Sequence, residues 1–151
     1  MGHILVTGGS RGIGRAICAK FKSNGWSVSY LYKSTKPTAD DMTAIMCDVK
    51  DYDCVRKAVT YAESVNGPID VLVSNSGISM SGLATDFGFD DYRLIMDTNF
   101  GGLFNTANAV IPSMIHNKRG SIIAISSMWG QTGASCEALY SATKGAINAM
   151  S

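Results

Sequence analysis

The chain has 151 residues, enough for a single domain with a buried core. Its 46% hydrophobic and 17% charged residues indicate a folded globular protein rather than a disordered one. The formal net charge of +1 excludes the strongly basic surface that nucleic-acid or anionic-membrane partners favour. No apolar run approaches the roughly 20 residues of a membrane span.

Cysteine and histidine usage gives no sign of a metal site. The two histidines, His3 and His116, lie far in sequence from any cysteine, and no C-x-x-C pair occurs. We therefore expect reduced thiols, no metal and no disulfide framework. The N-terminus lacks the basic and apolar regions of a signal peptide, so the sequence predicts a cytoplasmic protein. The four cysteines are Cys18, Cys47, Cys54 and Cys136.

Short apolar runs alternate with amphipathic segments along the chain. We predict a helix cap at Asp51 and a kink near Gly101-Gly102 and Pro112. Strands that are apolar throughout, alternating with helices, predict one α/β domain with a Rossmann-type, doubly wound parallel sheet. In chain order we expect strand 4–6, helix 13–21, strand 26–32, loop 33–41, strand 44–47, helix 51–65, strand 69–73, loop 79–88, helix 90–116, strand 121–125 and a helix from 136.

The turn between the first strand and the first helix reads Thr7-Gly8-Gly9-Ser10-Arg11-Gly12-Ile13-Gly14. Glycines at such a turn let backbone N–H groups approach a pyrophosphate at the positive end of the helix. The spacing G-x-x-x-G-x-G differs from the G-x-G-x-x-G dinucleotide fingerprint. A plain chain reversal is the alternative, but the position between strand and helix favours a nucleotide site.

This turn resembles the cofactor loop of the short-chain dehydrogenase/reductase family. The family's N-N-A-G segment is represented by Ser74-Asn75-Ser76-Gly77, in which two of four positions differ. The resemblance implies dinucleotide contacts after each of the first four strands. The implied residues are Gly8, Ser10, Arg11, Gly12, Ile13, Gly14, Tyr32, Lys33, Asp48, Val49, Asn75, Ser76 and Gly77.

The charges at two of these places predict the form of the cofactor. The second strand ends without the acid that binds the ribose 2′-OH of NAD, and Arg11 and Lys33 offer cations for the 2′-phosphate of NADP. In the family, basic residues at both places accompany NADP, so we predict NADP(H). The alternative is that both are solvated surface charges, and Asp48 has the alternative role of a turn residue.

Tyr140 and Lys144 stand four residues apart in the last predicted helix, which places both on one helix face. A nearby ammonium favours the phenolate, so the tyrosine can exchange a proton as a general acid or base. A second Y-x-x-x-K pair, Tyr32 and Lys36, ends just before Pro37, where a helix is disfavoured. We therefore dismiss the second pair as catalytic.

The resemblance adds two residues to this pair. Ser127, thirteen residues before Tyr140, matches the serine that hydrogen-bonds the substrate carbonyl, with Ser126 as the alternative. Asn99 matches an asparagine that holds a proton-relay water; otherwise it is a plain mid-helix residue. The implied reaction is hydride transfer to a ketone, with Tyr140 as proton donor, Ser127 stabilising the oxygen and Lys144 binding the nicotinamide ribose.

Within the family, the chain is most similar to the 3-oxoacyl-(acyl carrier protein) reductase branch. Trp129, the run from Gly133 to Glu137 and Asn75-Ser76-Gly77 resemble a bacterial subgroup that reduces 5-aminopentanone on a modified lysine of elongation factor P. Glu137 would suit a cationic amine, or it merely favours the N-terminus of a helix. The expected partners are a small-molecule or carrier-bound ketone, acyl carrier protein or elongation factor P.

The sequence stops seven residues after Lys144, whereas the family continues through further strands. We therefore expect the C-terminal strands of the usual fold to be missing and apolar edges to be exposed on one flank of the sheet. A non-catalytic nucleotide-binding fragment is the competing hypothesis. In relatives the helices carrying Asn99 and Tyr140 form a dimer surface, so a complete chain is expected to be a homo-oligomer.

Overall fold

The computed structural model describes residues 2–34 and 41–151. Its strands form one parallel sheet in the order β3-β2-β1-β4-β5. β1 lies in the middle of the sheet; β2 and β3 follow outward on one side, and β4 and β5 follow outward on the other. This is the doubly wound Rossmann-type arrangement predicted from the sequence. The strands are β1 (His3–Thr7), β2 (Ser27–Tyr32), β3 (Thr43–Met46), β4 (Val71–Ser74) and β5 (Ser121–Ala124).

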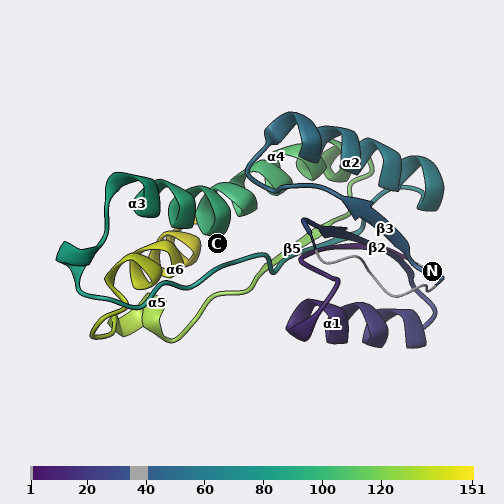
Figure 1. The fold of residues 1–151 in the computed structure, drawn as a ribbon. Coiled ribbons are helices and arrows are strands. Elements are labelled where there is room, and N and C mark those ends of the chain that lie inside the picture. The colour runs from purple at the N-terminus through teal and green to yellow at the C-terminus, as the bar shows by residue number, and fades with distance from the viewer. Residues whose placement is uncertain (1, 35–40) are drawn as a thin grey trace.

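Helices cover both faces of this sheet (Figure 1). α1 (Gly12–Ser23) lies on one face, and α2 (Tyr52–Asn66) and α4 (Gly102–His116) lie on the other. The remaining helices gather beside the edge of the sheet at which the strands end, which leaves a separate helical group next to the layered part (Figure 1). They are α3 (Phe89–Met96), α5 (Trp129–Thr132) and α6 (Ala138–Met150).

Strand alternation divides the core into two clusters, one on each face of the sheet. Leu5 packs with Val59 of α2 and Val110 of α4. Its neighbours Ile4 and Val6 point the other way, into the cluster beneath α1. All five of these side chains are almost fully buried, as expected for a parallel sheet covered on both faces.

The ends of α2 follow from local sequence chemistry. The carboxylate of Asp51 accepts a hydrogen bond from the backbone N–H of Cys54 at 3.0 Å, so the predicted N-cap is confirmed. The helix ends at Asn66, and Gly67 follows with φ 81°, a conformation that glycine adopts without strain.

The predicted helix over 90–116 is divided in the structure. A π-helical turn, η2 (Asp97–Gly101), separates α3 from α4. The π turn ends at Gly101, so the interruption lies at the predicted Gly101-Gly102 position, whereas Pro112 lies inside α4 without ending it. Insertion of a π turn depends on tertiary contacts, which residue periodicity does not report.

Three smaller differences concern the segments around the last strand and the last helix. The predicted loop 79–88 contains a short 3₁₀ turn, η1 (Ala84–Asp86). The four-residue helix α5 was not predicted. The last helix begins at Ala138 rather than at Cys136, because Cys136 adopts φ 59° and cannot belong to a right-handed helix.

The two edges of the sheet differ in their surroundings. Among the described strands β5 pairs with β4 alone, and Ile122 and Ile123 are 38% and 44% exposed, so the expected apolar flank is present. The connection from β2 to β3 was predicted to lack a helix; Lys36 and Pro37 in it lie outside the described residues.

Among the helices of the described ranges, none is both long and apolar enough to cross a membrane.

Candidate active site

The glycine turn after β1 is held against the segment that follows β4. Thr7 accepts hydrogen bonds through its hydroxyl from the backbone N–H groups of Asn75 and Ser76, at 2.9 and 2.8 Å. The Asn75 amide donates in return to the carbonyls of Thr7 and Gly8, at 3.0 and 3.3 Å. Two chain segments more than 60 residues apart therefore form one rigid rim at the start of α1.

A close contact explains one glycine of this turn. A β-carbon on Gly14 would overlap the Gly8 carbonyl and lie 2.6 Å from the Asn75 amide nitrogen. Gly14 therefore lets the first turn of α1 pack directly beneath the glycine loop. This role is structural, and Gly14 is the single predicted dinucleotide residue that does not line the pocket described next.

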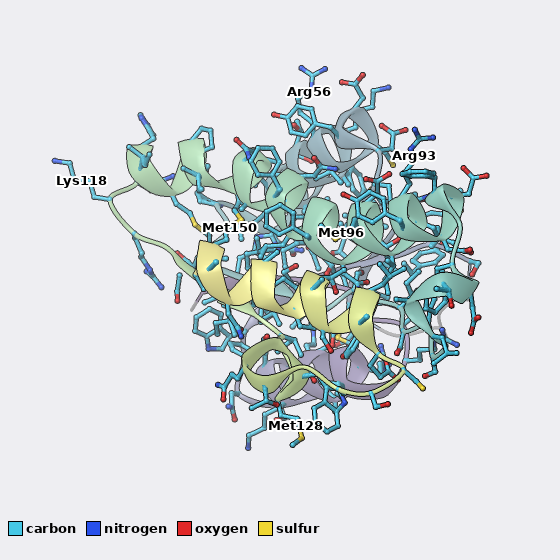
Figure 2. The ribbon with its side chains drawn as sticks, turned by 90° about the vertical axis from the view of Figure 1, so that its left-hand side faces the viewer. Arg56, Arg93, Met96, Lys118, Met128 and Met150 are labelled. Carbon is cyan, nitrogen blue, oxygen red and sulfur yellow. The ribbon has the colours of Figure 1, made fainter. Side chains whose placement is uncertain are left out.

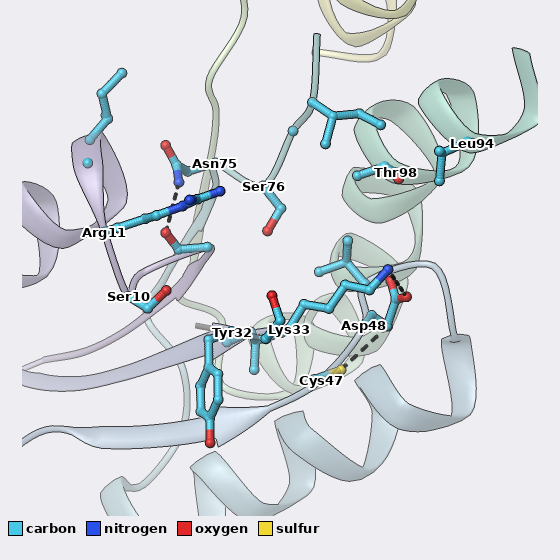
Figure 3. A pocket seen from close by; sticks show the side chains of 18 residues that line it. Ser10, Arg11, Tyr32, Lys33, Cys47, Asp48, Asn75, Ser76, Leu94 and Thr98 are labelled. Atoms are coloured by element: carbon cyan, nitrogen blue, oxygen red, sulfur yellow. Dashed lines mark hydrogen bonds and ion pairs between the residues drawn. The ribbon is translucent and has the colours of Figure 1, made fainter. Parts of the chain in front are cut away.

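Beside this rim lies a pocket of about 720 Å³, drawn in Figure 3. It runs along the carboxyl ends of the strands, where doubly wound sheets bind their ligands. Apart from Gly14, every residue that the sequence proposes for the dinucleotide lines it. Six further lining residues were not proposed: Leu31, Ser34, Cys47, Ile78, Leu94 and Thr98.

The charged side chains of the pocket come from three elements. Lys33 follows β2 and forms an ion pair with Asp48, with 2.8 Å between Nζ and Oδ2 (Figure 3). Burial raises the pKa of Asp48, but the hydrogen bonds from Lys33 and from the Lys50 backbone N–H outweigh burial and hold the pKa below its ordinary value. Arg11, at the N-cap of α1, lines the same pocket and is exposed. The described residues that line the pocket thus include two cations and one ionised carboxylate.

Tyr140 and Lys144 lie one turn apart on α6, as predicted. The ammonium nitrogen of Lys144 is 5.6 Å from the centroid of the Tyr140 ring. Lys144 is only 5% exposed, and its Nζ donates a hydrogen bond of 2.6 Å to the carbonyl of Ile125. Burial lowers the pKa of Lys144, which eases loss of its proton.

Asn99 lies in the π turn and is 1% exposed. Its Oδ1 accepts from the backbone N–H of Ile78 at 2.8 Å, and its Nδ2 donates to the Ile78 carbonyl at 2.9 Å. The same Nδ2 donates to the Thr143 hydroxyl at 3.0 Å, and that hydroxyl donates to the Tyr140 carbonyl at 2.7 Å. The side chain of Asn99 therefore joins the loop after β4 to α6, between Tyr140 and Lys144.

Two neighbouring serines follow β5, and they make different hydrogen bonds. Ser126 donates through its hydroxyl to the backbone carbonyl of Lys144, at 3.3 Å. Ser127 instead accepts from the backbone N–H of Trp129, at 3.3 Å, and keeps its hydroxyl proton for another acceptor. Ser127 lies three residues beyond the end of β5 and two residues before the first residue of α5.

The pocket and the catalytic pair meet at Gly77. A β-carbon on Gly77 would lie 3.3 Å from Oδ1 of Asn99 and 3.8 Å from Nζ of Lys144. Gly77 also lines the pocket. The end of the pocket is therefore next to the residues predicted to carry the chemistry. Figure 2 shows α6 lying between α5, marked by Met128, and the α3–η2 segment, marked by Met96.

Several side chains at this site were not found from the sequence. Thr143 stands between Tyr140 and Lys144, but its bond to Asn99 spans 44 residues and has no sequence signal. Ser79 and Ser81 donate hydrogen bonds to the two carboxylate oxygens of Glu137, at 3.1 and 2.5 Å. Glu137 is the N-cap residue of α6 but makes no side-chain capping bond, so its side chain binds the loop after β4 instead.

The described residues contain no group of three or more His, Cys, Asp or Glu side chains placed to hold a metal ion. Three features occur together here: the doubly wound strand order, a glycine loop at the centre of the sheet, and a Tyr–Lys pair at the end of one pocket. Together they define a dinucleotide-dependent type of oxidoreductase site.

Comparison with known proteins gives the family. A model of the short chain dehydrogenase family matches residues 2–151, so the chain belongs to that family, whose members bind a nicotinamide cofactor. The 3-oxoacyl-[acyl-carrier-protein] reductase MabA of Mycobacterium tuberculosis is 34% identical over 147 residues, covering 97% of this chain and 59% of the relative. The 3-oxoacyl-[acyl-carrier-protein] reductase FabG of Staphylococcus aureus is also 34% identical, covering 95% of this chain and 63% of the relative.

A solved structure agrees with these relatives. The ligand-free aldohexose dehydrogenase of Thermoplasma acidophilum superposes with a TM-score of 0.93 at 32% identity, covering 99% of this chain and 58% of that structure. The chain thus spans about three fifths of the length of the proteins that it matches. The predicted family and its similarity to 3-oxoacyl-(acyl carrier protein) reductases are confirmed.

Proposed function

We propose that the protein is an NADPH-dependent reductase that converts a ketone to an alcohol. The observation that carries the proposal is the position of Tyr140 and Lys144 on one face of α6, next to the pocket that ends at Gly77. A phenol beside a buried lysine is a proton donor and acceptor of the kind that carbonyl reduction needs.

The pocket fits a dinucleotide in size and chemistry. Its volume of about 720 Å³ lies within the range of cofactor sites. At Gly12, with φ 56°, a β-carbon would meet nothing within 4 Å, so the backbone at the start of α1 is open to a phosphate. Arg11 and Lys33 would hold the 2′-phosphate of NADP, Asp48 and Val49 the adenine, and Asn75, Ser76 and Gly77 the nicotinamide half. When bound, this cofactor supplies a hydride to the carbonyl carbon.

The protein's own side chains would handle the proton and the developing negative charge. Tyr140 donates its phenolic proton to the carbonyl oxygen, and the free hydroxyl proton of Ser127 hydrogen-bonds the same oxygen. Lys144 stabilises the phenolate left behind and exchanges a proton at Nζ. Asn99 fixes the π turn against Thr143 of α6. In this position Asn99 would hold the water that relays a proton to Lys144.

The test is oxidation of NADPH by a reactive ketone, followed at 340 nm with the purified chain, together with NADPH binding by fluorescence. We expect Tyr140→Phe to reduce turnover about 10²–10⁴-fold with little change in NADPH affinity. Unchanged turnover in this variant would overturn the assignment of the proton donor. Binding without turnover in the unaltered chain would instead favour the competing hypothesis, a nucleotide-binding protein without catalytic activity.

The proposed substrate is a 3-oxoacyl thioester on a carrier protein, because the MabA and FabG relatives bear that name. Glu137 supports a second candidate. Its carboxylate is fixed by Ser79 and Ser81 one helical turn before Tyr140, so a negative charge stands beside the proposed reaction centre. Such a charge favours a ketone carrying a primary amine, such as the 5-aminopentanone group of modified elongation factor P.

A comparison of two ketones separates these candidates. If the amine candidate holds, Glu137→Gln raises the KM for an aminoketone about tenfold and leaves the KM for an uncharged ketone of equal length unchanged. Equal effects on both ketones would leave the 3-oxoacyl substrate as the proposal.

We also propose that the protein self-associates through α4. Phe104, Ile111 and Ile115 recur at helical spacing on this helix and are 51%, 38% and 71% exposed. Analytical ultracentrifugation of the purified chain tests this, with Ile115→Glu expected to shift a dimer towards monomer.

A further inference from the structure

The turn that precedes α6 contains a strained backbone conformation. Cys136 has φ 59°, in the left-handed region that residues other than glycine rarely adopt. Lys118, the other described non-glycine residue with positive φ, directly follows the end of α4, where chains commonly adopt this conformation. Cys136 lies before a helix instead, so a helix end does not account for it. A strained residue of this kind persists only where its surroundings hold it.

Contacts from the loop after β4 hold the chain at Cys136 and directly after it. The backbone N–H of Gly82 donates to the Cys136 carbonyl at 2.8 Å. The next residue, Glu137, accepts hydroxyl hydrogen bonds from Ser79 and Ser81, one on each carboxylate oxygen. We call these three side chains the serine–glutamate clamp. Hydroxyl bonds to a carboxylate are shorter and stronger than bonds between neutral groups.

The clamp holds the point from which α6 begins. The Glu137 carbonyl accepts from the backbone N–H of Ser141 at 2.8 Å, which is the first hydrogen bond of the helix. Tyr140 follows within this first turn. A rotation of the backbone at Cys136 would therefore change where α6 begins, and with it the direction of the Tyr140 phenol.

We propose that the serine–glutamate clamp positions Tyr140 for proton transfer by holding Cys136 in its left-handed conformation. Ser79, Ser81 and Glu137 are thus positioning residues, which act on the proton donor through the backbone. The proposal rests on the proposed function, because the proton donor is assigned there. It applies equally to a charged and an uncharged ketone, since the clamp acts without touching the substrate.

The dinucleotide pocket should be insensitive to the clamp. Ile78, at the start of the same loop, is fixed separately by two hydrogen bonds between its backbone and the Asn99 amide. Gly77, at the end of the pocket, lies before this anchor. Loss of the clamp is therefore expected to lower turnover and to leave NADPH binding unchanged.

The experiment measures turnover of an uncharged ketone in the double variant Ser79→Ala/Ser81→Ala. We expect kcat to fall about tenfold with the KM for NADPH unchanged, because a displacement of about 1 Å at a reacting group has an effect of this size or larger. Ser135→Ala is the matched control, because the exposed Ser135 hydroxyl lies 3.8 Å from the Cys136 sulfur and outside the clamp. It should retain kcat. If the double variant does not fold, Ser81→Ala alone is measured in the same way.

A third substitution separates positioning from a general loss of structure. Glycine adopts the left-handed conformation without strain, so Cys136→Gly added to the double variant should restore most of the lost kcat. Cys136→Ala removes the same sulfur but keeps the strain, and should restore none. Rescue by both substitutions or by neither would overturn the proposal, as would an undiminished kcat in the double variant.

Hydrogen exchange tests the clamp without relying on catalysis. The Ser141 amide proton should exchange faster in the double variant than in the unaltered chain or in Ser135→Ala, because its bond to Glu137 begins the helix. An equal exchange rate in all three would contradict the proposal. If the unaltered chain reduces no ketone, the proposed function fails, and the clamp is then judged by this exchange rate alone.

Discussion

Replacement of Gly130 by alanine tests how closely α5 must approach the catalytic helix. A β-carbon on Gly130 would lie 2.7 Å from the carbonyl carbon and 2.8 Å from the carbonyl oxygen of Lys144. Both atoms belong to the backbone of α6, so no side-chain rotation can relieve the overlap. The distance from this β-carbon to the carbonyl carbon of Lys144 must grow from 2.7 Å to at least 3.4 Å before the contact becomes ordinary. The two helices must therefore move apart by about 0.7 Å.

Overpacking of this kind costs about 1–3 kcal/mol of unfolding free energy. For a chain of this length that loss lowers the melting temperature by about 3–10 °C. The neighbouring Gly145→Ala is the matched control, because its β-carbon would lie 3.6 Å from the Gly130 carbonyl oxygen, an ordinary contact. Gly145 is inside α6, where alanine stabilises a helix by about 0.5–1 kcal/mol relative to glycine. The two variants therefore have opposite expected signs.

Thermal unfolding followed by circular dichroism measures both variants, and NADPH oxidation with a ketone reports the effect on catalysis. We expect Gly130→Ala to lose at least about tenfold in turnover, because it displaces Ser127 relative to Tyr140. A melting temperature for Gly130→Ala at or above that of the unaltered chain would refute the reasoning. If Gly145→Ala is also destabilised, an added carbon at the α5–α6 contact lowers stability whatever its distance from the facing helix, and the distance argument fails.

Three further predictions concern other parts of the molecule. Burial lowers the pKa of His3 below 6.5, more than the Gly67 carbonyl and the charges of Glu63 and Asp70 raise it. The unfolded chain therefore takes up the proton first, so the unfolding free energy should decline as pH falls below about 6.5 and keep declining until the folded pKa is passed. Urea unfolding between pH 5 and pH 7.5 measures this slope, which His3→Gln should remove. Lys33→Ala should weaken NADPH about tenfold and leave NADH unchanged in a fluorescence titration; equal losses would mean that Lys33 does not contact the 2′-phosphate. Thr143→Val should lower the unfolding free energy by about 1–3 kcal/mol, because the Asn99 amide and the Tyr140 carbonyl each lose one hydrogen bond, whereas Thr143→Ser should retain both bonds.

The sequence predicted the layered part of the fold well because local signals act there. Asp51 caps α2 through a contact three residues away, and Gly67 ends it through its own backbone conformation. The group of helices beside the sheet was predicted less well. The start of α6 depends on the left-handed conformation of Cys136, and the π turn depends on packing against distant residues. No periodicity in the sequence reports either feature.

The same distinction holds for the site. The glycine turn and the Tyr140–Lys144 spacing are local patterns, and the structure places them as expected. The pairing of Lys33 with Asp48 joins residues that follow two different strands, so no local pattern in the sequence revealed it. Similarly, the partners of Asn99 lie 21 and 44 residues away.

The position of the helical group has a consequence for how the molecule opens. α6 makes its main contacts with α5, α3 and η2 rather than with a strand of the sheet. Asn99 and Lys144 bridge this group to the loop after β4 and the end of β5. Few bridges between two packed bodies favour partial opening without global unfolding. Amide protons of α6 should therefore exchange with solvent sooner than those of β1, and the catalytic half of the site should be the more easily rearranged half.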